Sequence, residues 1–583
     1  MLIAIKEFLR RIQWSIFPKS RKRHLPIAYG INFERFIGHL NAYWKNRSDK
    51  LGKHHASNGI LLVSQREHKA SDRIYLKNSI AYFIAQHKNL KLKGLLERFH
   101  DDNVYHMSKS VGMESFISMQ NPHYDIISRI KALFVSLYYF FKYNTGKKLL
   151  SLNHNNIHIG ESILDTIINF GDTHIEKITW PMYHVYFNIF FDYYKITQLL
   201  KKEKNIKYFL LHLEETVNNN RIICQVASAK FNIPLYVVYN NKGGHVAIKK
   251  YATYEDFLKH RFITHVPEYV LKDFECKPEL KSYMLRECDK VLDYYHNPKD
   301  ISTENYYAHY PDRKVMTRDE FYDQYNLNKK LPLVVIMSHT FYDTPHGQGE
   351  LLFEDFLEWF VETLKFIKNI DTVNWVIKPH PHEYVDSVQS RVKQNTHGEY
   401  KKIITKEYSN IRILNNDIKT KTFFDIADVF ITCVGTILVE SACYSIPTLG
   451  AGNSCFSDLG YSIDSHSKEE YFKNLSTIAN TPKLNTQQRD RAKLLFYFQN
   501  RIMFQVFDIF PTTYITKYER FTDTFYNSII ELLQKNPDIE SSHFIKNLYQ
   551  FLDNENVFLI KNHEIEPYLH PTPSHSNFKS LTN

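Results

Sequence analysis

The sequence has few cysteines and no pattern that would use them. Its 583 residues include six, at Cys224, Cys276, Cys288, Cys433, Cys443 and Cys455, and no two of them form a CxxC pair. This excludes a dense disulfide framework and the common zinc-binding motifs. Free and mostly buried thiols are typical of a reducing compartment. We therefore expect a cytoplasmic protein with no metal ion and no other cofactor.

The sequence also lacks a long apolar run. No stretch reaches the roughly 18 to 20 uncharged residues that a membrane span needs, and no apolar segment with a cleavage site indicates a signal peptide. Residues 1–25 instead combine apolar residues at helical spacing with a basic SRKRH segment. This amphipathic pattern predicts either a peripheral helix on the anionic inner face of the cytoplasmic membrane or a helix that packs on its own domain.

Signatures of nucleic-acid binding are absent too. A net charge of +11 is compatible with nucleic acid, an anionic membrane or anionic substrates. The basic residues are spread along the chain, however, with no zinc finger, aromatic RNA-binding motif or long basic arm. We therefore predict no nucleic-acid partner.

Two regions alternate between apolar strand-like runs and helix-like stretches, which is the pattern of parallel α/β sheets. The first covers residues 26–320 and includes helical insertions, and the second covers residues 331–480 and begins at LPLVVIMSH. Residues 481–565 contain two long helical patterns, which we expect to pack back on the first domain. The composition of residues 566–583, with proline, serine and histidine, predicts a flexible tail. The predicted fold class is α/β, with two such domains and additional helices.

Polar clusters stand where three predicted strands of the second region end. Ligands of open parallel sheets bind outside the carboxyl ends of the strands, because loops and helix N-termini converge there. The sequence therefore predicts one ligand-binding rim. Its candidate residues are His339 after the first of these strands, Lys378, His380 and Pro381 after the second, and Thr432, Gly435 and Thr436 after the third.

The CVGT turn between a strand and a helix predicts a phosphate-binding site. Gly435 permits a close approach, Thr436 offers a hydroxyl, and the start of the helix offers amides and a positive dipole end. Such turns also serve as plain tight connections. Glu440, one turn into the helix, would bind ribose hydroxyls or lie as an exposed carboxylate. Lys378 and His380 would stabilise a diphosphate or a departing nucleotide phosphate.

Three segments, SHTFYDTPHGQGELLFEDFLEWFVETL, VNWVIKPHP and DVFITCVGTILVESACYSIPTLGAG, resemble the donor domain of bacterial capsule and related surface-polysaccharide biosynthesis transferases. That family has the GT-B fold of two facing Rossmann-like domains. Its His-Pro pair and Ser/Thr-Gly turn are similar to motifs of CMP-sugar transferases, including Kdo-transferring enzymes. The resemblance covers residues 331–461. It implies that His380 and Pro381 contact the CMP-like portion and that the 432–436 turn binds its phosphate.

The resemblance also implies the partners. They would be a nucleotide-sugar donor of the CMP-Kdo kind and a growing glycan or lipid-linked glycan, as in capsule, O-antigen or lipopolysaccharide synthesis. The turn reads TCVGT, without the paired serines of many relatives, so the donor base stays open.

The first domain would then hold the acceptor and the catalytic base. An acceptor hydroxyl needs a carboxylate or a histidine within hydrogen-bond reach before it attacks. Glu214 and Glu215, followed by Arg221, resemble the acidic position and the arginine of the family. The further candidates are Asp172 as a base and His174, Gly243, Gly244 and His245 on the acceptor side. The pattern does not choose among them.

Three alternatives stay open at this point. A glycerophosphate or ribitol-phosphate transferase of the teichoic-acid type would use a cytidine nucleotide on the same fold and leave a phosphodiester. His380 and His382 form an HxH pair, with which some metal hydrolases begin a site, although no HExxH or CxxC motif supports one. A non-catalytic scaffold would retain a degenerate donor fold.

Overall fold

The computed structural model describes most of the chain in a series of segments. These are residues 33–51, 57–65, 71–96, 102–119, 122–169, 174–217, 220–241, 245–259, 264–296, 313–380, 410–414, 418–511, 523–554, 557–561 and 565. The predicted N-terminal segment 1–25 and the predicted tail 566–583 lie outside the described residues, as do Asp172, Gly243, Gly244, Pro381 and His382.

The first domain is built on a sheet whose strands run in the order β3-β2-β1-β6-β7-β8-β16. The first five strands are parallel, whereas β8 is antiparallel to β7 and β16 is antiparallel to β8. Numbered along the chain, the parallel strands have the order 3-2-1-4-5 of a Rossmann-like domain. The strands are β1 (Ile60–Ser64), β2 (Lys91–Leu96), β3 (Ser115–Ser118), β6 (Ile206–His212), β7 (Leu235–Asn241), β8 (His245–Tyr251) and β16 (Gln505–Val506), and β4 (Asn153–His154) pairs with β5 (Ile157–His158) in a separate ribbon.

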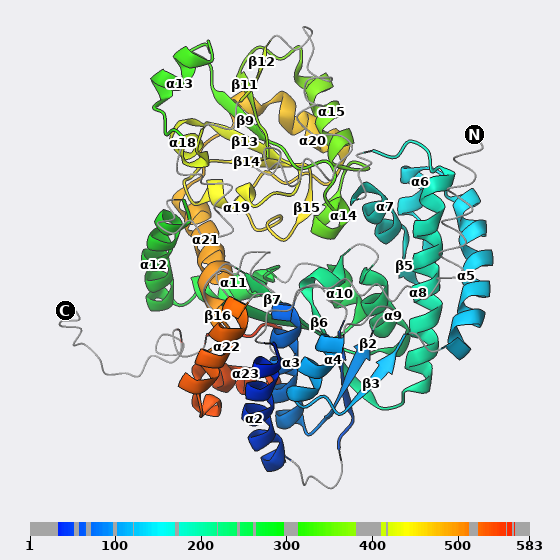
Figure 1. Ribbon diagram of the computed structural model, residues 1–583. Helices are drawn as coiled ribbons and strands as arrows, with labels where there is room; N and C mark the ends of the chain where they lie inside the picture. The colour runs from blue at the N-terminus through cyan, green and yellow to red at the C-terminus, as the bar shows by residue number, and fades with distance from the viewer. Residues whose placement is uncertain are drawn as a thin grey trace, which may run out of the picture.

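Helices cover both faces of this sheet, because its central strands are apolar on both sides (Figure 1). In β1, Leu61 and Val63 belong to one buried cluster and Leu62 belongs to another, as the alternation of side chains along a strand requires. The helices of this domain are α2 (Phe33–Leu51), α3 (Ser71–Lys88), α4 (Asp102–Ser110), α5 (Pro122–Lys142), α6 (Gly146–Leu150), α7 (Gly160–Asn169), η1 (Trp180–Met182), α8 (Tyr183–Lys202), η2 (Leu213–Thr216), α9 (Arg221–Phe231), α10 (Tyr254–Lys259), α11 (Glu268–Glu275) and α12 (Pro278–His296).

The second domain has a parallel sheet in the order β12-β11-β9-β13-β14, again 3-2-1-4-5 along the chain. Val334 and Ile336 of β9 pack in a cluster with α15, whereas Leu333 and Val335 pack on the opposite face. The strands are β9 (Leu333–Met337), β11 (Asn374–Lys378), β12 (Ile411–Ile413), β13 (Val429–Thr432) and β14 (Thr448–Gly450), and β10 (Gly349–Leu351) pairs with β15 (Gly452–Ser454). The helices are α13 (Arg318–Gln324), α14 (Pro345–Gln348), α15 (Phe356–Ile367), α18 (Thr420–Ile426), α19 (Ile437–Ala442), α20 (Lys468–Ser476) and η7 (Ile478–Asn480).

The chain then returns to the first domain (Figure 1). Helix α21 (Thr486–Tyr497) and the π-helix η8 (Phe498–Ile502) lead into β16, which extends the first sheet beside β8. Helices α22 (Asp523–Lys535) and α23 (His543–Asp553), separated by η10 (Ile539–Ser541), add buried residues to the cluster around α2 and α3. Two Rossmann-like domains thus face each other, with C-terminal helices on the first. This arrangement confirms the predicted α/β fold class of the GT-B type.

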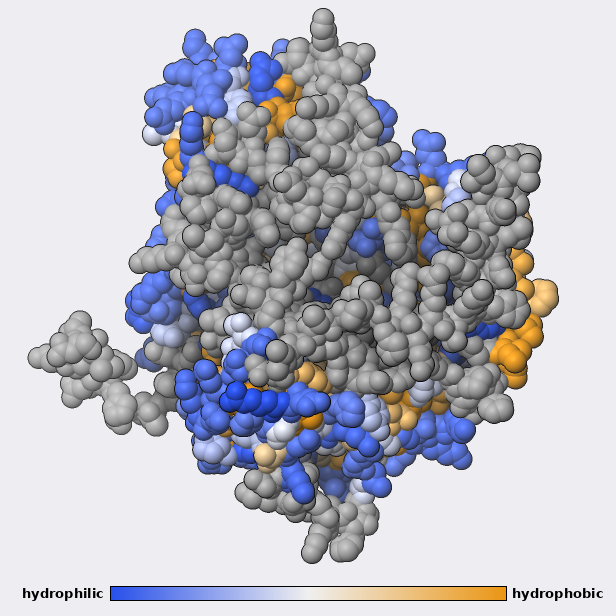
Figure 2. Space-filling view, viewed as in Figure 1, coloured by the Kyte–Doolittle hydropathy of each residue, from blue (hydrophilic) through white to orange (hydrophobic). Residues whose placement is uncertain are grey.

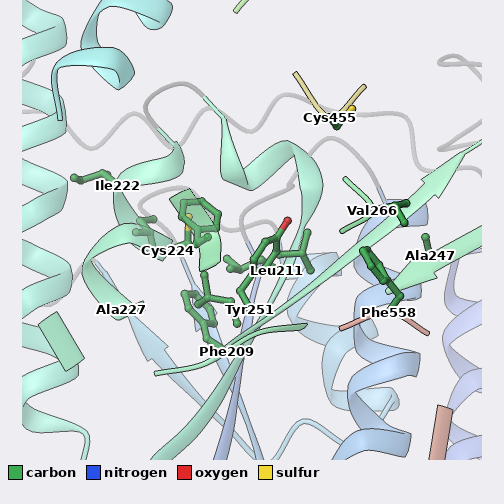
Figure 3. Packing of buried hydrophobic residues seen from close by; sticks show 14 of the residues in the cluster. Phe209, Leu211, Ile222, Cys224, Ala227, Ala247, Tyr251, Val266, Cys455 and Phe558 are labelled. Carbon is green, nitrogen blue, oxygen red and sulfur yellow. The ribbon is translucent and has the colours of Figure 1, made fainter. Parts of the chain in front are cut away.

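One apolar cluster is continuous between the two domains. It joins Phe209 and Leu211 of β6 to Val266 of the first domain and to Cys455 of the second (Figure 3). The six cysteines form no disulfide, and all but Cys276 are buried. Within the described ranges, no helix has both the length and the apolar character that crossing a bilayer would require.

Candidate functional site

The carboxyl ends of three neighbouring strands bring most of the predicted donor-side residues to one edge of the second sheet. Strand β9 lies between β11 and β13, and all three are parallel. Ser338, just before His339, donates its backbone N–H to the carbonyl oxygen of Lys378 at 3.2 Å. The loops that follow these strands therefore start side by side, at the edge where α/β sheets bind their ligands. We call this edge the rim.

His339 holds the turn that follows β13. Its Nε2 lies 3.1 Å from Thr432 Oγ1 and accepts the backbone N–H of Val434 at 3.4 Å. Its ring stacks on Phe356 at a centroid distance of 4.2 Å, and burial lowers the pKa of His339 to about 3. A neutral imidazole that accepts through Nε2 carries its proton on Nδ1. The structure thus places His339 behind the turn, where it positions Thr432 and Val434.

Gly435 is required by the close packing of that turn. A Cβ at this position would lie 2.8 Å from Thr432 Oγ1 and 3.6 Å from His339 Cε1. Thr436 follows, exposed at the start of α19, and its side chain makes no capping hydrogen bond. Because the hydroxyl is not used to cap the helix, it is available to a ligand at the rim.

Lys378 and Arg313 place two buried cations in the second domain. Lys378 ends β11 and is 4% exposed, and Arg313 is 8% exposed. Burial, with a smaller contribution from the charge of Arg313, lowers the pKa of Lys378 to about 7. An anion bound within reach would restore the charge on this lysine. Arg313 precedes the predicted start of the domain at residue 331, and no motif marks it in the sequence.

His380 and Glu440 differ in accessibility. His380 lies two residues beyond β11 and is half-buried. Glu440 is 7% exposed within α19, so it is not the exposed carboxylate that an outer helical face would give. A ribose contact by Glu440 stays a prediction.

The candidate residues of the first domain fall at separate places. Glu214 and Glu215 belong to η2, which directly follows β6, and the structure describes their backbone only. Arg221, the first residue of α9, is buried and forms an ion pair with Glu161 at 3.0 Å. His245 begins β8 and lies opposite Asn241 of β7. Arg221, the arginine that the family resemblance identified, is therefore engaged in an ion pair within the first domain.

Two histidine–aspartate pairs connect the domains. His346 Nδ1 in α14 lies 2.7 Å from Asp165 Oδ1 in α7, and the backbone N–H of His346 donates to the same oxygen at 3.2 Å. His174 Nδ1 lies 2.6 Å from Oδ2 of Asp355, the N-cap of α15. Each domain contributes the histidine of one pair and the aspartate of the other. We call them the crossed pairs.

The crossed pairs bring α14 beside the acidic segment of the first domain. A Cβ built on Gly347 in α14 would lie 3.4 Å from Cγ1 of Val217, the residue after η2. The backbone of Glu214 and Glu215 is therefore close to the second domain.

Sequence reasoning missed both aspartates of the crossed pairs. Asp165 stands in GESILDTIIN, an otherwise apolar helix in which it is 1% exposed. Asp355 begins a D-x-x-E pattern, and its side chain accepts the backbone N–H of Glu358 at 2.8 Å. An acidic residue in an apolar helical pattern and a capping signature were the available signals, but neither identifies a partner.

The pairing favours the charged form of both histidines. The hydrogen bond to Asp355 is the largest influence on His174, and together with nearby carboxylates it outweighs burial and raises the pKa to about 9. For His346, burial is the largest single influence and favours the neutral form, but the charge and hydrogen bond of Asp165 outweigh it and raise the pKa. His174 is therefore protonated at neutral pH and does not serve as a general base there.

Replacing His174 with Gln is expected to remove a pH-dependent part of the stability. The folded pKa exceeds the unfolded value of about 6.5, so the contribution is complete below pH ~6.5 and is lost as the pH rises through about 9. Because the pair is partly exposed, we expect the free energy of unfolding to fall by only about 1 kcal/mol at pH 6 and by much less at pH 10. Urea unfolding of both proteins at the two pH values measures this, with His466→Gln as an exposed control. An equal loss at both values would contradict it.

Comparisons with known proteins give similarity to solved structures only. No family model matches the sequence, and no curated protein matches it. The KpsC β-Kdo 2,4 transferase of Thermosulfurimonas dismutans is 11% identical, with 50% of this chain and 81% of that chain covered and a TM-score of 0.30. The UDP-GlcNAc 2-epimerase of Neisseria meningitidis is 11% identical, with coverage of 82% and 99% and a TM-score of 0.22. The wall teichoic acid polymerase TagF is 9% identical, with coverage of 93% and 100% and a TM-score of 0.21. At these values the similarities assign neither a donor nor a residue.

Proposed function

We propose that the protein is a glycosyltransferase that moves a sugar from a cytidine-nucleotide donor of the CMP-Kdo kind to a surface glycan or lipid-linked glycan. The observation that carries the proposal is the rim. There the turn at Gly435 and Thr436 follows β13, and Lys378 and His380 stand at the end of β11. These two strands flank β9, and their ends lie opposite the first Rossmann-like domain. Positive charge and hydrogen-bond donors at such an edge suit a nucleotide phosphate.

Each group has a proposed role in the transfer. Thr436 and the Gly435 turn would bind the phosphate next to the sugar, and Lys378, with Arg313, would supply positive charge. His380 would stabilise the nucleotide phosphate as the glycosidic bond to the sugar breaks. The base that takes the proton of the acceptor hydroxyl would be Glu214 or Glu215, with Asp172 as the further candidate. No metal or other cofactor enters this scheme.

A nucleotide screen followed by product analysis tests the proposal. CMP or CDP should raise the thermal midpoint more than UDP or GDP, since a ligand at one hundred times its dissociation constant adds about 2.7 kcal/mol of stability. The product should then be an acid-labile glycoside with CMP released. A phosphodiester product would replace sugar transfer by polyol-phosphate transfer. The absence of any shift with all four nucleotides would favour a non-catalytic scaffold.

Thr436→Ala is expected to weaken nucleotide binding about tenfold without lowering stability, because the hydroxyl makes no capping bond in the protein. Calorimetric titration with CMP and a thermal melt measure the two effects. Ser467→Ala is the matched control: Ser467 caps α20 by accepting the N–H of Glu470, so its loss should cost about 1 kcal/mol of stability and leave nucleotide affinity unchanged. Equal affinities of the Thr436→Ala variant and the parent protein would remove Thr436 from the phosphate site.

A further inference from the structure

Helix α5 exposes an apolar surface along most of its length. Six large side chains, at Ile126, Ile127, Ile130, Phe134, Tyr138 and Phe141, are each between 52% and 67% exposed. Apart from the adjacent pair Ile126 and Ile127, they recur at steps of three or four residues, so they form one stripe of about 22 Å along the helix. We call this stripe the α5 ridge. In Figure 2 a hydrophobic patch marks the edge of the molecule at which Figure 1 places α5.

The opposite face of α5 is already packed. Phe140 contacts Tyr183 and Tyr186 of α8 at ring-centroid distances of 5.4 and 5.6 Å, and Tyr139 stacks on Phe190 at 5.3 Å. A surface helix normally has one apolar face for its own core and one polar face for water. Helix α5 is apolar on both, so its own packing does not account for the ridge. Contiguous exposed apolar surface of this kind marks an interaction site.

The charges around the ridge indicate what covers it. Residues 122–150 contain five basic residues and one acidic residue. Lys131 and Lys142 on α5, together with Lys147 and Lys148 on α6, are exposed. A second copy of the chain placed on this face would bring the same lysines and few carboxylates to pair with them. An anionic lipid surface offers a negative partner to each lysine and accepts the apolar side chains between the headgroups.

The aromatic residues at one end of the ridge fit the same partner. Trp180 is 45% exposed, and its ring lies 5.6 Å from that of Phe141. Tyr138 lies on the ridge itself, with its hydroxyl accepting a hydrogen bond from Lys142 at 3.4 Å. Trp and Tyr are favoured at the depth of lipid headgroups, because one part of each side chain is apolar and another is polar.

We propose that the α5 ridge is a docking surface for an anionic membrane, with α5 lying parallel to the bilayer plane. The ridge would enter the boundary between headgroups and acyl chains, and the four lysines would contact the headgroups. This inference goes beyond the proposed transferase activity and does not depend on it, because vesicle binding requires neither a donor nor turnover. It also involves a surface different from the predicted N-terminal segment 1–25.

Vesicle co-sedimentation of the full chain tests the proposal. The probes are vesicles of phosphatidylcholine alone and of phosphatidylcholine with phosphatidylglycerol, at low and high salt. We expect binding to the anionic vesicles that weakens at high salt. The variant Ile130→Glu, Phe134→Glu should lose at least about tenfold in partition coefficient, since two apolar side chains would no longer enter the lipid. The variant Lys142→Gln, Lys147→Gln, Lys148→Gln should lose roughly fivefold per lysine at low salt.

A matched control and two further measurements distinguish membrane docking at the α5 ridge from a second copy of the chain and from binding by the N-terminal segment. Tyr269 and Val315 are also exposed, at 64% and 54%, and lie outside α5, so Tyr269→Glu, Val315→Glu should bind vesicles like the parent protein. Sedimentation velocity without lipid reports the oligomeric state. A ridge variant that turns a dimer into a monomer and keeps vesicle binding would overturn the proposal in favour of a second copy. Loss of binding only on deletion of residues 2–17 would overturn it in favour of the N-terminal segment. Unchanged far-ultraviolet circular dichroism is the requirement for comparing the variants.

Discussion

His380→Ala is expected to lower turnover about a hundredfold or more while the protein stays folded. That is the size of effect expected when one preorganised group that stabilises developing charge is removed. His380 lies two residues beyond β11 at the rim and is half-buried, so the end of the strand positions it. The change removes an imidazole at the surface of the domain and none of the buried side chains of the second sheet, so stability should change little.

Transferase activity with a CMP-linked donor and a thermal melt measure the two effects. His466→Ala is the control, because His466 is another histidine of the same domain and its side chain is 61% exposed. It should retain full activity. If a folded His380→Ala protein kept the activity and the nucleotide affinity of the parent protein, the donor site would not include the end of β11. His382→Ala, which lies outside the described residues, should have a smaller effect because it is two positions farther from the strand.

The fold could be predicted because its signals are local. Apolar runs such as LPLVVIMSH contain residues for both faces of a parallel strand, and β9 uses them in that way, with alternate side chains in two clusters. The ends of the helices are harder to predict from the sequence. The spacing of Leu352, Phe356, Phe360 and Leu364 predicts a helix that starts at Leu352, whereas α15 begins at Phe356, where Asp355 caps it. Capping overrides apolar periodicity at that point.

The rim was predictable for a topological reason, whereas the contacts between domains were not. The residues of the rim follow three strands that the 3-2-1-4-5 order makes neighbours. The crossed pairs instead join residues 181 positions apart in sequence, and each depends on how one whole domain sits on the other. The position of His339 behind its turn likewise depends on stacking with Phe356. Such contacts come from tertiary packing, for which a single sequence contains no local pattern.

The crossed pairs also bear on how the proposed reaction would be assembled. A donor at the rim and a base in η2 belong to different domains, so their separation is set by the domain contact. Asp165 and His346 lie in that contact with side chains that are 2% and 6% exposed. A buried pair of this kind fixes one relative position of the partners more strictly than apolar packing does, because its geometry is directional.

Asp165→Ala is expected to destabilise the protein by about 3 kcal/mol, because it leaves His346 buried without the carboxylate that favours its charged form. His346→Ala should cost a similar amount, and the double variant should cost much less than the sum of the two, since the second change removes a group that has already lost its partner. Urea unfolding of the four proteins at pH 6 provides the double-mutant cycle. The loss should be smaller above the raised pKa of His346, where the histidine is neutral in both proteins.

Thr166→Ala is the control that distinguishes loss of the contact between the domains from destabilisation of helix α7 itself. Thr166 is the next residue on the same helix, is buried, and donates to Ser162 O at 2.6 Å inside the first domain. Loss of this hydrogen bond should lower the free energy of unfolding by about 1 kcal/mol both at pH 6 and above the pKa of His346. The Thr166→Ala change should show no coupling to His346→Ala. If Asp165→Ala behaved in the same way, the aspartate would stabilise its own helix and not the contact between the domains. A coupling energy of about 2 kcal/mol for Asp165 with His346 alone would instead mean that this pair sets the distance between the acidic segment after β6 and the rim.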